Sequence, residues 1–193
     1  MRTALILSAL AAFATPAAAE PYERFKALCL DADSDPAVTE QAARSMNWVP
    51  APAELVAQFP IDSPELVGFV SDDPAIPTAA DGEFVMAYRG LITDPADRNV
   101  DIFMCVMGGR SSFSESQSRI EGWLGTGGVD DEGVVNWVYT LTAGVPESAV
   151  ELAMQGEDAM AELARQQPIY LLKLTNEGDG LVGLFLGVTR IPL

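Results

Sequence analysis

The amino-acid sequence predicts an α+β domain, in which an antiparallel sheet of about five to six strands has helices packed on one face. Two pairs of apolar runs of strand length are each joined by a short segment of turn residues. A fifth run alternates between apolar and polar residues, and capping-box patterns open helices between the runs. Because strands joined by tight turns are antiparallel, these patterns favour one antiparallel sheet.

Residues 20–65 form a helical, proline-rich front to this domain. Residues 23–30 are expected to form a short helix with Phe25, Leu28 and Cys29 on one face. Asp35-Pro36 then predicts an N-cap and first helical residue, and this second helix continues to about Met46. Its inward stripe is predicted to be Val38, Ala42 and Met46. The prolines of 49–64 leave two alternatives, a pair of short helical turns or an extended crossing segment.

The strands are expected in the remainder of the chain. Residues 66–70 are a candidate first strand, followed by a loop over 71–82. The alternation over 134–142 places Val135, Trp137, Tyr139 and Leu141 on one face. The two hairpins are predicted at 84–92 with 100–107, and at 169–175 with 181–191.

Two capping boxes predict the later helices. Ser112-x-x-Glu115 opens a helix that turns Phe113, Ile120 and Leu124 inward, and the glycines of 125–128 end it. Ser148-x-x-Glu151 opens another, which we expect to run to Pro168 with one apolar face. That face consists of Ala149, Leu152, Ala153, Gly156, Met160, Leu163 and Ala164.

Residues 1–19 have the pattern of a cleavable secretory signal. Arg2 precedes an apolar run over 5–14, and Ala17-Ala18-Ala19 provides small residues at a cleavage site after Ala19. The alternatives are an N-terminal membrane anchor and a buried helix. Cleavage would leave residues 20–193 as a single α+β domain in the periplasm or outside the cell. No later apolar run is long and uninterrupted enough to span a membrane.

Two cysteines, Cys29 and Cys105, remain in this exported chain. An oxidising compartment favours a disulfide between them. Cys29 lies on the apolar face of the first helix, and Cys105 lies in the middle of a predicted strand, so a helix packed on the sheet would bring them together. The competing interpretation is two separate buried thiols.

The chain is strongly acidic, with 28 acidic residues, 11 basic residues and a net charge of −17. Such a charge repels nucleic acid and anionic lipid, and it attracts a cationic protein or peptide. A dispersed negative charge also confers solubility by itself. The sequence contains no histidine, which excludes histidine-based triads, acid–base catalysis and metal ligation. We therefore expect no cofactor and no metal site.

Three local patterns have competing interpretations. Asp31, Asp33 and Asp35 resemble the start of a calcium loop, but Pro36 and Ala42 occupy its glycine and glutamate positions, so a capped turn is favoured. The glycines of 125–128 are interpreted as a turn, because no lysine follows them as in a phosphate loop. Glu115, Glu121 and Asp130 lie near this loop together with Trp123, and two such carboxylates could serve a hydrolase of cell-wall sugars.

Phe25-x-x-x-Cys29, Ala42-Ala43 and Trp48 together resemble the opening of a family of small secreted proteobacterial proteins of unknown function. The resemblance implies export and a paired Cys29, and no activity. The chemistry excluded above, the acidic surface and the compact disulfide fold favour a non-catalytic binding or inhibitor protein of the periplasm. The carboxylate-based hydrolase is the alternative.

Overall fold

The computed structural model describes residues 21–57, 63–71, 83–93, 99–110, 112–176 and 181–190. The predicted signal segment 1–19 lies outside these ranges, as do most of the predicted loop over 71–82 and the turns of both long hairpins. In the described part of the chain, no helix is long and apolar enough to cross a membrane.

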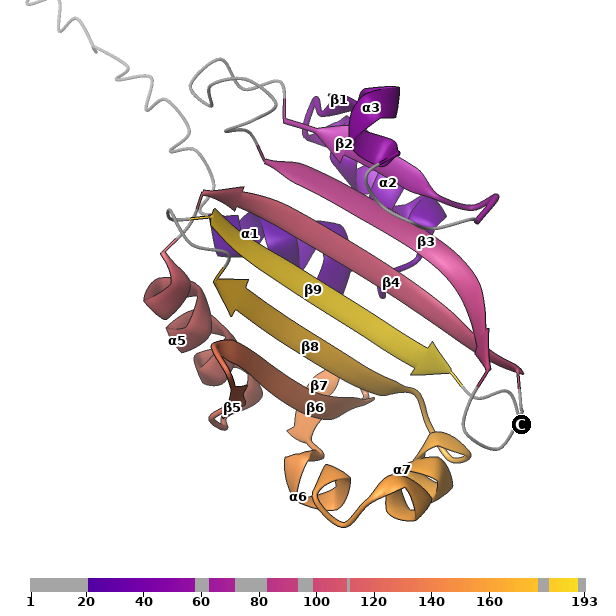
Figure 1. Cartoon of the computed structure of the whole chain (residues 1–193), viewed down its shortest axis with the longest axis vertical. Helices are drawn as coiled ribbons and strands as arrows, with labels where there is room; N and C mark the ends of the chain where they lie inside the picture. The colour runs from indigo at the N-terminus through magenta and orange to yellow at the C-terminus, as the bar shows by residue number, and fades with distance from the viewer. Residues whose placement is uncertain are drawn as a thin grey trace, which may run out of the picture.

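The strands form one antiparallel sheet in the order β1-β2-β3-β4-β9-β8-β6-β5, and β7 also pairs with β6 (Figure 1). The α+β class is therefore confirmed, and so are both predicted long hairpins. The sheet has nine strands because three short ones, β1, β5 and β7, were not predicted. The bounds are β1 Val49–Pro50, β2 Val67–Val70, β3 Phe84–Thr93, β4 Asn99–Arg110, β5 Val129–Asp131, β6 Val134–Thr142, β7 Val145–Ser148, β8 Ile169–Asn176 and β9 Leu181–Arg190.

The first helices lie behind the sheet in Figure 1 and contact β2, β3 and β4. α1 (Pro21–Phe25) continues directly into the π-helix η1 (Lys26–Leu30), and α2 (Pro36–Ser45) follows. A short helix, α3 (Ala53–Val56), follows β1. The proline-rich segment thus contains both alternatives that the sequence left open, one helical turn and a short extended piece.

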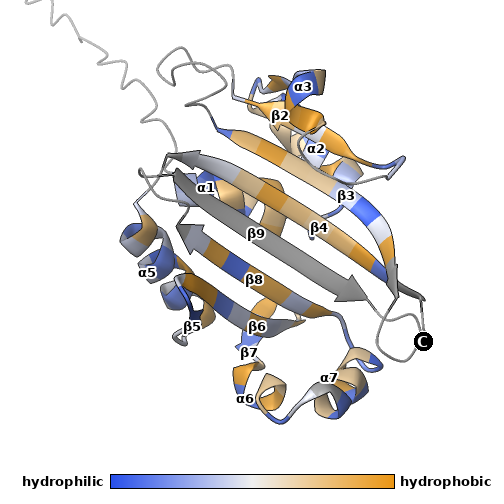
Figure 2. Cartoon of the chain, in the orientation of Figure 1, coloured by the Kyte–Doolittle hydropathy of each residue, from blue (hydrophilic) through white to orange (hydrophobic). Residues whose placement is uncertain are grey.

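Alternate residues of the long strands face these helices and build the core. They include Val85 and Ala87 of β3, Leu172 and Leu174 of β8, and the predicted inward row of β6. In that row Val135, Trp137 and Tyr139 are buried, and Leu141 packs against them. Figure 2 shows apolar residues along both β3 and β4. The period-2 pattern therefore predicted the buried side of β6 correctly.

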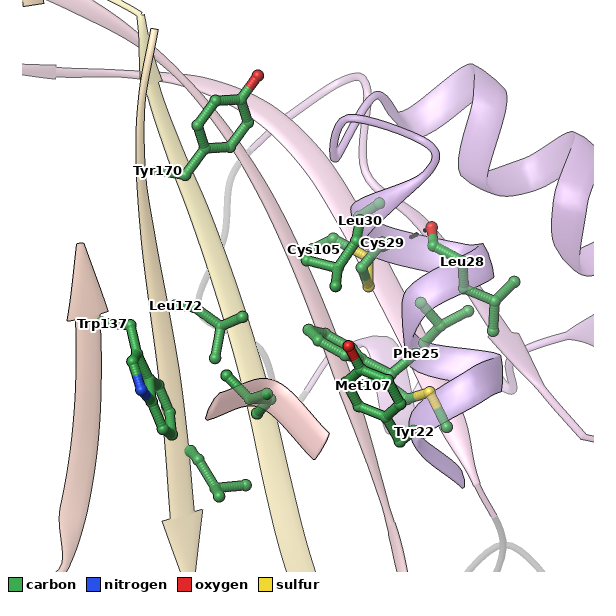
Figure 3. Packing of buried hydrophobic residues seen from close by; sticks show 14 of the residues in the cluster. Tyr22, Phe25, Leu28, Cys29, Leu30, Cys105, Met107, Trp137, Tyr170 and Leu172 are labelled. Carbon is green, nitrogen blue, oxygen red and sulfur yellow. Dashed lines mark hydrogen bonds between the residues drawn. A yellow bond between two sulfur atoms is a disulfide. The ribbon is translucent and has the colours of Figure 1, made fainter. Parts of the chain in front are cut away.

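A disulfide joins the π-helix to the middle of the sheet. Cys29 and Cys105 are bonded, their Cα atoms are 5.5 Å apart, and both residues are fully buried (Figure 3). Phe25 and Leu28 lie beside the bond and are also fully buried. The predicted bridge is confirmed, and the interpretation as two free thiols is wrong.

The inward face of α2 differs from the predicted stripe. Asp35 caps the helix as expected, and its carboxylate accepts hydrogen bonds from the backbone N–H groups of Ala37 and Val38. Thr39 and Ala43 are the buried positions, however, and Val38 is 47 % exposed. The Thr39 hydroxyl donates to the Leu28 carbonyl at 2.9 Å, which satisfies both buried polar groups. This bond explains why a threonine faces inward where the pattern favoured a valine.

The helix predicted from the second capping box is broken. Ser148 belongs to β7, and α6 (Val150–Ala153) begins after Ala149 without a side-chain cap. A separate helix, α7 (Glu157–Ala164), follows Gly156, whose φ of +108° interrupts the helical path. By contrast, α5 (Phe113–Leu124) matches its prediction, with Ser112 as N-cap, Ile120 and Leu124 buried, and Gly125 in the left-handed conformation at its end.

Candidate functional site

Of the three carboxylates considered for a hydrolase, two lie on α5 and one lies on β5. Glu115 is an exposed residue in the first turn of α5, and Glu121 is a half-buried residue further along the same helix. Six positions separate them, which corresponds to about 9 Å along the helix axis. Asp130 is an exposed residue of β5. Glu115 and Glu121 are thus spread along one helix, and Asp130 lies on a separate strand.

Each of these residues takes part in local structure. The backbone N–H of Glu115 donates to the Ser112 hydroxyl that caps α5. The carboxylate of Glu121 accepts a hydrogen bond from Gln117 at 2.8 Å. The carboxylate of Asp130 accepts one from the Gly133 backbone at 3.0 Å and so closes the β5–β6 turn. Trp123 packs edge-on against Tyr139, with ring centroids 5.2 Å apart.

The three aspartates before α2 also bind separate partners. Asp31 pairs with Lys26 at 2.5 Å, Asp33 accepts a hydrogen bond from the Tyr170 hydroxyl at 2.7 Å, and Asp35 caps α2. Among the residues that the structure describes, no group of three acidic or cysteine residues is arranged to hold a metal ion.

The glycine-rich loop after α5 has a packing role. Gly125 ends α5 with a φ of +68°. Gly128 lies directly on Trp137, and a Cβ atom placed at Gly128 would fall 2.6 Å from Cε2 of that ring. The loop is therefore a close-packed turn that covers a core tryptophan.

A cluster of tyrosines lies under the helices, next to this loop. Tyr139 stacks on Tyr170 with ring centroids 4.9 Å apart, and Tyr170 is the residue that binds Asp33. Burial, with smaller contributions from Tyr170, Asp33 and Tyr22, raises the pKa of Tyr139 well above its usual value. Burial likewise raises the pKa of Tyr22 to about 12. These phenols stay neutral at physiological pH and belong to the core.

The strongest concentration of charge lies at the β6 side of the sheet. Residues 120–164 contain nine acidic residues and neither lysine nor arginine. They form the end of α5, the strands β5, β6 and β7, and the helices α6 and α7 (Figure 1). β5 and β7 both pair with the edge of β6 that faces away from β8. We name this region the acidic edge, after its exposed carboxylates Asp130, Asp131, Glu132, Glu147, Glu151, Asp158 and Glu162.

Apolar side chains are exposed among these carboxylates. Val129 of β5 is 47 % exposed, Val145 of β7 is 61 % exposed, and Met154 after α6 is 80 % exposed. The two arginines that flank the segment are held by acidic neighbours, because Arg165 pairs with Glu162 and Arg119 lies 4.0 Å from Glu23. The acidic edge thus combines a large excess of negative charge, of which Arg165 offsets the charge of Glu162, with accessible apolar surface.

Sequence reasoning treated the acidic residues as dispersed and missed this grouping. The available signal was the interval between Arg119 and Arg165, which contains no basic residue.

Comparison with protein family models, curated proteins and solved structures finds no match to this chain.

Proposed function

We propose that this chain is an exported, non-catalytic protein that binds a cationic protein or peptide through the acidic edge. The observation that carries the proposal is the concentration of nine acidic residues, without a basic one, along one side of the sheet. A surface of one sign attracts a partner of the opposite sign and raises the association rate. The Cys29–Cys105 disulfide supports the proposed export, because such bonds persist mainly in oxidising compartments.

The direct test uses a defined cationic probe, a 20-residue oligolysine, and titration calorimetry at two salt concentrations. We expect binding in 20 mM salt and a loss of affinity of about tenfold or more in 200 mM salt, since salt screens exposed charges. The double substitution Glu147→Gln/Glu151→Gln should weaken binding about fivefold, at about 0.5 kcal/mol for each exposed charge.

Two exposed carboxylates outside the acidic edge provide the matched control. Glu54 lies in α3 and Glu65 lies just before β2, at the opposite side of the sheet. The variant Glu54→Gln/Glu65→Gln changes the net charge by the same amount and should bind oligolysine as the parent protein does. Equal losses in the two double variants would show attraction by net charge alone and would contradict a binding role for this edge.

A further inference from the structure

The sheet face opposite α1 and α2 is partly exposed across its middle, whereas other residues of the same face are buried, namely Met86, Ile102, Val106, Thr140 and Ile169. Figure 1 shows α1 and α2 behind the sheet, with no helix in front of β4, β9 and β8. We name this side the open face. Its position follows from the disulfide, because Cys105 points to the helices and its neighbours Met104 and Val106 therefore point away from them.

An apolar row crosses the middle of the open face. The strand register aligns Tyr88 of β3 with Met104 of β4, and Leu171 of β8 with Val138 of β6. Gly187 of β9 pairs with both Met104 and Leu171, so the position between them has no side chain. The four larger residues are all partly exposed, and the Tyr88 hydroxyl lies 3.1 Å from the Met104 sulfur. Sheets with helices on one face commonly present a polar outer face, and this row departs from that pattern.

The open face carries little charge, in contrast to the chain as a whole. Among its described residues on β3, β6 and β8, Lys173 is the one charged side chain, and it is exposed. The apolar row ends at Val138 on β6, the strand whose outer edge pairs with β5 and β7. The apolar row therefore borders on the acidic edge.

We propose that the open face binds the apolar side of a cationic amphipathic segment whose lysines and arginines reach the acidic edge. This inference rests on the proposed function and names the class of partner. Five strands at a spacing of about 4.8 Å make the row about 19 Å long, which about 13 residues of a helix would span.

Charge selects this occupant over the two obvious alternatives. A second copy of the chain would bring a net charge of −17 against an equal charge, with both acidic edges close to the interface. An anionic lipid surface would be repelled by the same carboxylates. A basic amphipathic segment satisfies both surfaces at once, because its apolar side meets the row and its basic side meets the edge.

The experiment compares two 14-residue peptides of equal positive charge. One is a helical lysine/leucine peptide with an apolar face, and the other has serine in place of each leucine. We expect the protein to bind the amphipathic peptide at least about tenfold more tightly than the serine peptide, because binding buries two or three apolar side chains. The variant Met104→Gln/Leu171→Gln should lose this preference and still bind the serine peptide as before.

The control is Val38→Gln, which changes an apolar residue that is 47 % exposed on α2, on the helix side of the sheet. It should leave both affinities unchanged. If the parent protein binds both peptides equally, or if Met104→Gln/Leu171→Gln keeps the preference, the role of the open face is overturned and the proposed function stands. If neither peptide binds at low salt, both proposals fail.

Two further measurements keep the test decisive. Lys173→Gln removes an exposed charge that opposes a cationic partner on this face, so it should tighten the amphipathic peptide about twofold and leave oligolysine unaffected. An unchanged affinity for the amphipathic peptide would overturn the proposal even if the double variant fails to fold.

Light scattering of the parent protein should show a monomer. A dimer that Met104→Gln/Leu171→Gln dissociates would assign the open face to a second copy and overturn the proposal.

Discussion

Arg24 and Glu83 form a buried ion pair that ties α1 to the residue before β3. The guanidinium donates to the carboxylate at 2.6 Å, and a second pair of atoms, Nε and Oε2, lies 2.5 Å apart. The Arg24 side chain is 15 % exposed and that of Glu83 is 4 % exposed. Because an unpaired buried charge destabilises the folded state, the loss of either residue should leave the charge of the other destabilising.

The first prediction concerns this pair. Arg24→Leu leaves the Glu83 carboxylate buried without its partner and should lower the free energy of unfolding by about 3 to 5 kcal/mol. The double variant Arg24→Leu/Glu83→Leu should recover part of that loss, because it removes the orphaned charge. Urea denaturation of both single variants and the double variant measures the coupling. Arg165→Leu is the control, since its exposed pair with Glu162 should contribute less than about 1 kcal/mol. Additive losses from the two single variants would contradict the coupling.

The second prediction concerns the contact between Gly128 and Trp137. Gly128→Ala places a methyl group 2.8 Å from the indole Nε1, so the loop or the ring must move. Overpacking of this kind should lower the free energy of unfolding by about 1 to 3 kcal/mol. Gly127→Ala is the matched control, because a Cβ atom there meets nothing within 4 Å. Denaturant unfolding followed by tryptophan fluorescence compares the two, and equal stability would contradict the close packing.

The third prediction concerns the disulfide, whose cysteines are 76 positions apart in the sequence. The variant Cys29→Ala/Cys105→Ala should lose up to about 4.5 kcal/mol, the chain-entropy value for a loop of this length. The parent protein should also resist mild reductant at neutral pH, because both sulfurs are buried. Mass spectrometry after thiol alkylation, with and without denaturant, follows the bond. Rapid reduction of the native protein would show that this region opens more easily than the packing indicates.

The fourth prediction concerns alkaline pH and Tyr22. Its pKa is about 12 in the folded protein, mainly through burial and then through Glu23 and Asp31, against 10.0 for an ordinary tyrosine. Between these values the folded state keeps the proton that the unfolded state releases, so the free energy of unfolding should fall as pH rises from about 10 to about 12. Tyr22→Phe should make that decline shallower. Urea unfolding at several pH values measures the slope, and an identical slope in the variant would contradict the assignment.

The long elements were predictable because each rests on a strong local pattern. The runs at 84–92 and 100–107 are apolar and bounded by turn residues, and the structure pairs them as β3 and β4. β5 and β7 were missed because they are only three and four residues long. Their signal lay in the turns that lead into and out of β6, where Glu132-Gly133 and Ala143-Gly144 all have positive φ. Such two-residue turns specify hairpins.

The rest depended on tertiary contacts that local patterns do not contain. The buried side of α2 was settled by the hydrogen bond from Thr39 to Leu28, a residue of another helix. The acidic edge arises because α6 and α7 follow β7 at the same side of the sheet. The sequence shows the acidic residues, and only the positions of these helices show that the residues lie along one side. The open face is a property of strand order, which the sequence left undetermined.

The place of β9 in the sheet has a consequence for the timing of folding. It is the last strand in the sequence, yet it lies between β4 and β8, and it provides the join between the β1–β4 group and the β5–β8 group. Without residues 181–190, no strand pairing joins the two groups, and both cysteines belong to the first part of the chain, Cys29 in η1 and Cys105 in β4. The oxidative bond can form early in that part of the chain, while the cooperative closure of the sheet has to wait for the final segment. The strand order thus makes the pairing of β9 the step that joins the two halves of the sheet.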